Sequence, residues 1–316
     1  MNRLKYFLCG IMLFLCGCST SVQNTDDRPY VMTTIFSSYD FARQIAGDKV
    51  NVNLLLPPGS EAHSFEPSPK DIINIQNADL FIYTGGKSDS WIDDILSTID
   101  TGNMEIIRLM DVCETVEEEL IEGMQETDHN HNEEAHEEND TEYDEHVWTS
   151  PKNAVLITQA ISDGLCKADE LNSDFYKKNT ENYINQLNEL DNKFREVVNS
   201  AKRDTLIFAD RFPFRYFADE YGLKYYAAFP GCAEETEADI STVTFLIDKV
   251  REENIPVVFY IEFSNHKLAD AVSEETGAKT MLLHSCHNVT KEEFDQGITY
   301  IDLMNNNVEA LKEALY

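Results

Sequence analysis

The sequence predicts an α/β protein whose two lobes are joined by one long helix. Two series of alternating strand-like and helix-like segments lie on either side of residues 172–203, a segment without Gly or Pro. Such alternation is typical of parallel sheets covered by helices. Hydrophobic residues make up 42% of the 316 residues, which is enough to build a core and excludes wholesale disorder.

The N-terminus has the pattern of a secretory signal. Arg3 and Lys5 precede an apolar run at 6–15, which is too short for a bilayer span of roughly 20 residues. Leu15-Cys16-Gly17-Cys18 then resembles the bacterial lipobox, which implies cleavage before Cys18 and acylation of that cysteine. An ordinary signal that happens to contain cysteines is the alternative. We expect a lipoprotein signal peptide at 1–17 and a polar tether at 18–28.

The N-terminal lobe, expected at 29–170, contains four predicted strands, at 30–36, 50–56, 80–84 and 104–109. Ser37 or Ser38 is the expected cap of a helix that Gly47 ends. Ser68, followed by Pro69, marks the start of a second helix that runs to residue 78.

The connecting segment shows apolar residues at helical spacing from Phe175 to Val198. About 30 residues at 1.5 Å each would span roughly 45 Å. Such a helix could belong to one domain alone. Because a second α/β series follows it, we expect a rigid connector at 171–203.

The C-terminal lobe, expected at 204–316, repeats the alternation of strands and helices. Strands are expected at 205–209, 224–229, 257–261 and 279–283, and helices at 214–221, 239–253, 267–276 and 292–316.

Four cysteines remain beyond the signal and the lipobox, namely Cys113, Cys166, Cys232 and Cys286. They are too sparse for a disulfide scaffold. A single bridge between Cys232 and Cys286 and a set of isolated thiols both stay open.

The charge of the chain favours cations as partners. A formal net charge of −33 disfavours nucleic acid and anionic lipid. No basic residue lies between Arg108 and Lys152, and His129, His131 and His136 are interleaved with acidic residues there. We expect an acidic, histidine-rich loop at 114–145 that captures metal ions weakly at several positions; a solvating spacer is the alternative.

Three further histidines stand where predicted segments enter loops. His63 follows the second strand, His146 precedes a helix that starts at Pro151, and His284 ends the last strand. Ligands of open parallel sheets bind beyond the carboxyl ends of the strands. Imidazole suits Zn²⁺ and related transition metals, so these three histidines are candidate ligands of one ion.

Two motifs carry a resemblance to a known family, supported by residues 51–71, 75–85 and 214–223. They are His63-Ser64-Phe65-Glu66-Pro67-Ser68-Pro69 and His146-Val147-Trp148-Thr149-Ser150-Pro151. From about residue 30 to the C-terminus the chain resembles the substrate-binding lipoproteins of bacterial zinc/manganese ABC importers, cluster A-I. The resemblance implies two lobes, each with a four-stranded parallel sheet flanked by helices, and a metal ion buried between them.

The resemblance also implies the ligands, with one departure. His63 and His146 match the first two family ligands, but the third falls on Arg211, which stays protonated and cannot ligate. Neighbouring Asp210 could substitute, or Arg211 could pair with Glu262 and close the cleft. The fourth family ligand falls on His284.

The expected site is therefore His63, His146 and His284 with one oxygen, from Asp210, Glu262, Glu61 or water. Such a set favours Zn²⁺ over Mn²⁺. Because Cys286 and His287 lie near His284 in the sequence, a thiolate ligand is a minor alternative.

The sequence thus predicts a receptor rather than an enzyme. It contains no Gly-x-Ser-x-Gly, His-Glu-x-x-His or phosphate-binding glycine motif. We expect a monomeric, extracytoplasmic protein, anchored to the cell membrane only through lipidated Cys18, that captures Zn²⁺ and delivers it to an ABC permease and its ATPase. The rivals are the same receptor for Mn²⁺ or Fe²⁺, a secreted zinc hydrolase and a surface adhesin.

Overall fold

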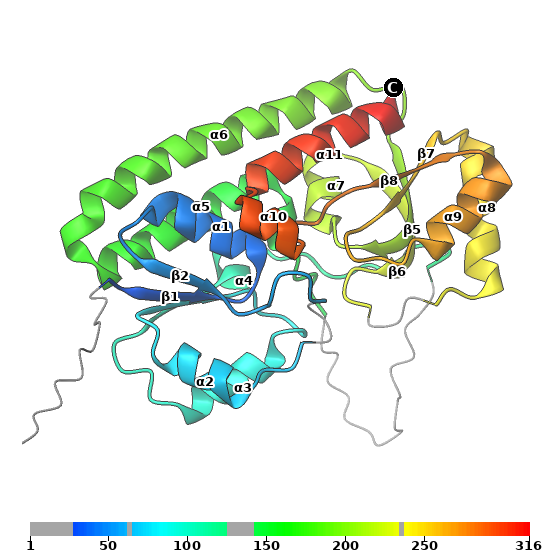
Figure 1. The fold of residues 1–316 in the computed structure, drawn as a ribbon. Helices are drawn as coiled ribbons and strands as arrows, with labels where there is room; N and C mark the ends of the chain where they lie inside the picture. Colours follow the sequence, from blue (N-terminus) through cyan, green and yellow to red (C-terminus); the bar gives the residue numbers. More distant parts are fainter. Residues whose placement is uncertain (1–27, 62–64, 125–141, 234–236) are drawn as a thin grey trace, which may run out of the picture.

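The computed structural model describes residues 28–61, 65–124, 142–233 and 237–316, and it contains two four-stranded parallel sheets (Figure 1). The strand order is β2-β1-β3-β4 in the first sheet and β6-β5-β7-β8 in the second. This arrangement confirms the predicted α/β class with two sheets. Cys18, His63, His129, His131 and His136 lie outside the described residues, as does the predicted signal peptide.

The first sheet belongs to the N-terminal lobe. Its strands are β1 (Tyr30–Thr33), β2 (Asn51–Leu54), β3 (Leu80–Tyr83) and β4 (Glu105–Arg108). Its helices are α1 (Phe36–Ala46), α2 (Pro69–Gln76), α3 (Ser90–Thr98), α4 (Leu109–Val112) and α5 (Pro151–Ala168), with the short 3₁₀ helix η1 (Val147–Thr149) before α5. Ser68 caps α2 as predicted, through a reciprocal capping box with Asp71. The sequence did not predict α3 or α4.

The second sheet belongs to the C-terminal lobe. Its strands are β5 (Thr205–Phe212), β6 (Lys224–Pro230), β7 (Val257–Tyr260) and β8 (Lys279–Leu282). Its helices are α7 (Arg215–Tyr221), α8 (Ile240–Glu253), α9 (Lys267–Thr276), α10 (Lys291–Gln296) and α11 (Tyr300–Leu315). The prediction of a single closing helix at 292–316 is wrong. Gly297 has a φ of 76° and ends α10, and Thr299 caps α11 with Asp302, so the chain turns between two helices.

The connector is α6 (Ser173–Asn199), which follows the 3₁₀ helix η2 (Glu170–Asn172). Its 27 residues span about 40 Å. Figure 1 shows α6 running alongside both sheets with α11 beside it. One hydrophobic core contains Val31 of β1, Leu187 of α6 and Phe259 of β7, so the two lobes share a continuous core.

Despite its length, α6 is too polar to cross a bilayer, and no other helix in the described part of the chain meets the length and hydropathy that crossing requires. The cysteines at 113, 166, 232 and 286 are free thiols. The bridge between Cys232 and Cys286 that the sequence left open is therefore not formed.

The segment after β8 crosses back onto the N-terminal lobe. The backbone N–H of Phe36 donates to the carbonyl of His287 at 2.9 Å, and the N–H of Gly59 donates to Val289 at 2.8 Å. The amide of Asn288 donates to the carbonyls of Pro57 (2.8 Å) and Ser60. These bonds hold the residues after the last strand between the two sheets.

Candidate metal centre

A pocket lies between the lobes, at the carboxyl ends of both sheets. It is lined by Ser60, Glu61, His146, Arg211, Pro213, Gly231, Ile261, Glu262, Phe263, Ser285, His287 and Asn288. The N-terminal lobe provides the residues up to His146, and the C-terminal lobe provides the others. Two histidines and three charged side chains therefore meet at one position between the sheets.

His146, directly before η1, is completely buried and is fixed by Asp144. The Asp144 carboxylate accepts from the backbone N–H of His146 at 2.8 Å and lies 3.1 Å from Nδ1. Because a carboxylate only accepts, Nδ1 carries the proton and the lone pair is on Nε2. Burial lowers the pKa of His146, but Asp144, Glu145 and Glu118 together raise it by more, so this pKa is raised overall. The ring is thus oriented as in many metal-binding histidines.

His287 meets His146 in the pocket. Their ring centroids are 5.8 Å apart in an edge-on arrangement, and the Trp148 ring packs against both. The indole N–H of Trp148 donates to the carbonyl of Ser285 at 2.8 Å, which ties η1 to the loop that carries His287. His287 was not among the ligands predicted from the sequence, although it follows His284 by only three residues.

His284, the predicted ligand after β8, does not line the pocket. Its Nδ1 accepts the backbone N–H of Cys286 at 2.9 Å, which places the ring proton on Nε2. Its backbone is held by Asn307 of α11 through two bonds of 2.8 Å. Cys286, between His284 and His287, has a φ of 61°. His284 therefore supports the loop in this structure.

Asp210, the predicted oxygen ligand, lies inside β5 rather than at its end. Its carboxylate accepts from the backbone N–H of Arg211 at 2.8 Å and of Ile261 at 3.2 Å. Burial raises the pKa of Asp210, and these bonds lower it in part. Because both oxygens serve neighbouring backbone, Asp210 joins β5 to the chain after β7, and it is not among the residues that line the pocket.

Glu262 likewise serves the loop after β8. It accepts from the backbone N–H groups of Ser285 at 2.8 Å and His287 at 3.3 Å, and from the Ser285 hydroxyl. These hydrogen bonds are not the pairing of Glu262 with Arg211 that the sequence left open as an alternative.

Arg211 instead forms a two-pronged ion pair with Glu61 of the other lobe. Its two terminal nitrogens donate to the two carboxylate oxygens at 3.2 and 3.0 Å. The Arg211 side chain is 7% exposed and that of Glu61 is 34% exposed. A guanidinium in this position links the lobes and cannot bind a cation.

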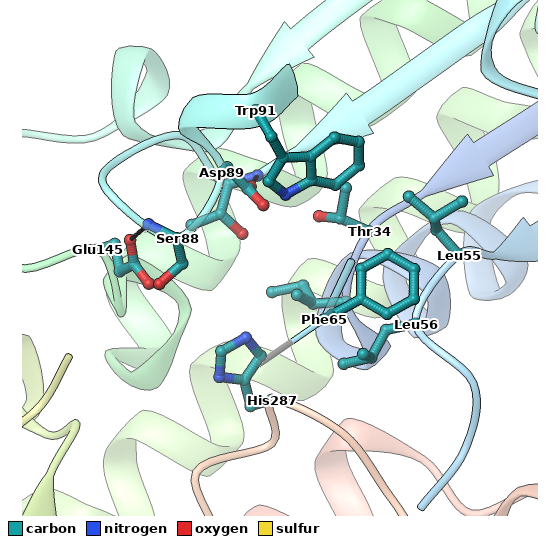
Figure 2. A pocket seen from close by; sticks show the side chains of 11 residues that line it. Thr34, Leu55, Leu56, Phe65, Ser88, Asp89, Trp91, Glu145 and His287 are labelled. Atoms are coloured by element: carbon teal, nitrogen blue, oxygen red, sulfur yellow. Dashed lines mark hydrogen bonds between the residues drawn. The ribbon is translucent and has the colours of Figure 1, made fainter. Parts of the chain in front are cut away.

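A second pocket adjoins the first and shares His287 with it (Figure 2). Phe65, Trp91, Leu55 and Leu56 form its apolar side. On its polar side Glu145 accepts the backbone N–H of Ser88 at 3.1 Å, drawn as a dashed line in Figure 2.

Asp89 is the other acid of the second pocket. It accepts the backbone N–H groups of Thr84 and Gly85 at 2.9 and 3.1 Å. Burial, and then the Glu145 charge, raise the pKa of Asp89 to about 7.

The two ends of the acidic histidine-rich segment meet close to His146. The backbone N–H of Asp144 donates to Val116 at 3.0 Å, and that of Glu118 donates to Glu142 at 2.9 Å. Both ends of this segment are therefore fixed beside the pocket.

Comparison with known proteins places these observations in a family. The family described as "Zinc-uptake complex component A periplasmic" matches residues 31–314. The high-affinity zinc uptake system protein ZnuA of Bacillus subtilis is 34% identical over 310 residues, covering 97% of this chain and 95% of that protein. The zinc-binding lipoprotein AdcA of Streptococcus pneumoniae is 32% identical over 99% of this chain, which spans 61% of AdcA.

Two solved structures have the same fold. The Zn(II)-bound ZnuA-like domain of Streptococcus pneumoniae AdcA aligns with a TM-score of 0.73 and 30% identity, over 91% of this chain and 99% of that one. The metal-dependent lipoprotein YcdH of Bacillus subtilis aligns with a TM-score of 0.75 and 32% identity over the same shares.

Proposed function

Because this chain belongs to the zinc-uptake complex component A family, we propose that it captures Zn²⁺ outside the cytoplasm and delivers it to an ABC-type importer. The family match confirms the sequence-based prediction of a zinc-binding receptor for ABC import. One observation carries the proposal. His146 and His287, one from each lobe, line the same pocket with their ring centroids 5.8 Å apart. Two imidazoles so placed can hold a borderline-soft dication between the lobes.

The proposed ligands differ from the set predicted from the sequence in one histidine. We assign His146 and His287 to the ion, and we replace His284 because its Nδ1 already accepts the backbone N–H of Cys286. Asp210 is not retained, since both its oxygens accept backbone N–H groups.

His63 stays a sequence-based prediction because it lies outside the described residues. Its described neighbours Glu61 and Phe65 line the first and the second pocket respectively. This placement of its neighbours is compatible with a ligand at position 63.

Zinc titration of matched variants tests the assignment. His287→Asn and His146→Asn should each weaken zinc binding about tenfold or more, because each removes an imidazole ligand. His284→Asn is the control, since the Asn carbonyl can accept the Cys286 N–H in place of Nδ1. If His284→Asn lost tight zinc binding while His287→Asn kept it, our assignment would be wrong.

We further propose that zinc is cargo and not a catalytic cofactor, because the pocket holds it between two lobes that must release it. The mature protein is then a monomer anchored through Cys18, and its partners are the permease and ATPase of the importer. In this proposal His129, His131 and His136 gather zinc weakly near the pocket, because the two ends of their segment are fixed beside His146.

A further inference from the structure

A thiol and a carboxylate lie next to the His146 ring. Donor atoms of Glu145, His146 and Cys232 all lie within 4.8 Å of one another. Glu145 and His146 are 2% and 0% exposed. We propose that Cys232 and Glu145 are ligands of the ion that His146 binds, so that the cargo site contains sulfur. This inference rests on the proposed function and deepens it.

The separations suit a transition metal. With a Zn–S bond of about 2.3 Å and Zn–N or Zn–O bonds of about 2.0 Å, the ligand atoms of a tetrahedral site with one sulfur lie about 3.3–3.5 Å apart. The upper bound of 4.8 Å on the separations in this structure exceeds these values by about 1.3–1.5 Å. In this proposal, binding of the ion draws the three donors together by that amount.

The three donors come from both lobes. Glu145 and His146 directly precede η1, whereas Cys232 is the second residue after the end of β6. An ion held by this set would therefore bridge the lobes, as a receptor that closes around its cargo requires.

Gly231 lets the end of β6 approach the imidazole closely. A Cβ at this position would lie 3.0 Å from the Phe212 carbonyl oxygen and 3.1 Å from Cε1 of His146. The backbone N–H of Cys232 donates to Glu118 at 3.2 Å, which fixes the turn that presents the sulfur.

Charge around the sulfur also favours a cation. Two carboxylates lie close to Cys232: Glu145 is one of the three donors within 4.8 Å of one another, and Glu118 accepts the backbone N–H of Cys232 at 3.2 Å. A divalent ion would offset this concentration of negative charge, and on binding it the thiol releases its proton to solvent and coordinates as thiolate.

A sulfur ligand would compensate for Arg211. The Arg211 guanidinium occupies the position at which the family resemblance implies a ligand from the C-terminal lobe. Cys232 would supply a donor from that lobe instead. Thiolate selects Zn²⁺ and Cd²⁺ and disfavours Mn²⁺. The cargo class we infer is therefore thiophilic divalent cations.

Cobalt substitution of the mature chain tests this inference. Thiolate bound to Co²⁺ gives an intense charge-transfer absorption in the near ultraviolet, and imidazole and carboxylate do not. We expect this band at one equivalent of Co²⁺ in the wild type, its loss in Cys232→Ser and Cys232→Ala, and zinc affinity about tenfold or more weaker in both. Glu145→Gln, whose amide oxygen can still accept the Ser88 N–H, should also weaken zinc binding.

Cys166→Ser is the matched control, because Cys166 is a half-buried free thiol on α5. It should keep both the band and the affinity, and urea unfolding would show whether each variant is folded. Tight zinc binding without a thiolate band in the wild type, or a band that survives in Cys232→Ser, would overturn the sulfur ligand while the receptor proposal stood. Failure of the wild type to bind zinc tightly would instead reject the proposed function, and the sulfur ligand with it.

Discussion

The ion pair between Arg211 and Glu61 should stabilise the contact between the lobes. At the 3.0 Å separation of its closer atoms, two unit charges attract by about 5–6 kcal/mol with an effective dielectric constant of about 20. The Glu61 side chain is 34% exposed, so solvent screening reduces this attraction, and desolvation of the guanidinium opposes it. We expect a net coupling of about 1–3 kcal/mol.

A double-mutant cycle measures that coupling. Glu61→Gln, Arg211→Met and the double variant would be unfolded in urea, and the non-additive part of the free energy of unfolding is the pair's contribution. Because the pair joins the lobes, each single variant should also release zinc faster in a stopped-flow chelator assay. The coupling should shrink as salt is raised, since Glu61 is partly exposed.

Additive single variants would refute this reasoning. If the coupling were below about 0.5 kcal/mol, within the error of such cycles, the pair would not hold the lobes together. Unchanged zinc release in both single variants would separately show that the ion pair has no part in retaining the cargo.

Three other outcomes follow from the structure. The raised pKa of Asp89, about 7, means that the folded state keeps a proton that the unfolded chain releases above about pH 4. The wild-type free energy of unfolding should therefore fall relative to that of Asp89→Asn, by about 2–4 kcal/mol between about pH 4 and pH 8. Urea unfolding of both proteins across this pH range measures the difference between their free energies of unfolding. A difference that stayed constant with pH would contradict the prediction. Gly231→Ala should weaken zinc binding about tenfold and destabilise the fold by about 1–3 kcal/mol, because the added Cβ would crowd His146 and the Phe212 carbonyl. Calorimetry measures the zinc affinity, and an unchanged affinity would exclude that crowding. Deletion of residues 127–141 should reduce the number of weak zinc sites and leave the tight one; loss of the tight site in equilibrium dialysis would show that the loop belongs to it.

Local signals in the sequence located most of the secondary structure. Apolar runs marked the eight strands of the described residues, and Ser68 marked the start of a helix through hydrogen bonds that form within a few residues. Gly297 also ends a helix, but the sequence-based prediction ran one helix through it where the chain forms two. His146 was predicted as a site residue because its motif and its position before a helix are both local properties.

The sequence alone therefore determined the α/β class, the long connector and the chemical character of the site, because each depends on composition, periodicity or a short motif. Only the tertiary structure decided which side chains meet. Nδ1 of His284 accepts the Cys286 N–H and Asn307 binds the His284 backbone, while His287 lines the pocket. The approach of Cys232 to His146 depends on how two sheets pack across a shared core, and no spacing along the chain encodes that contact.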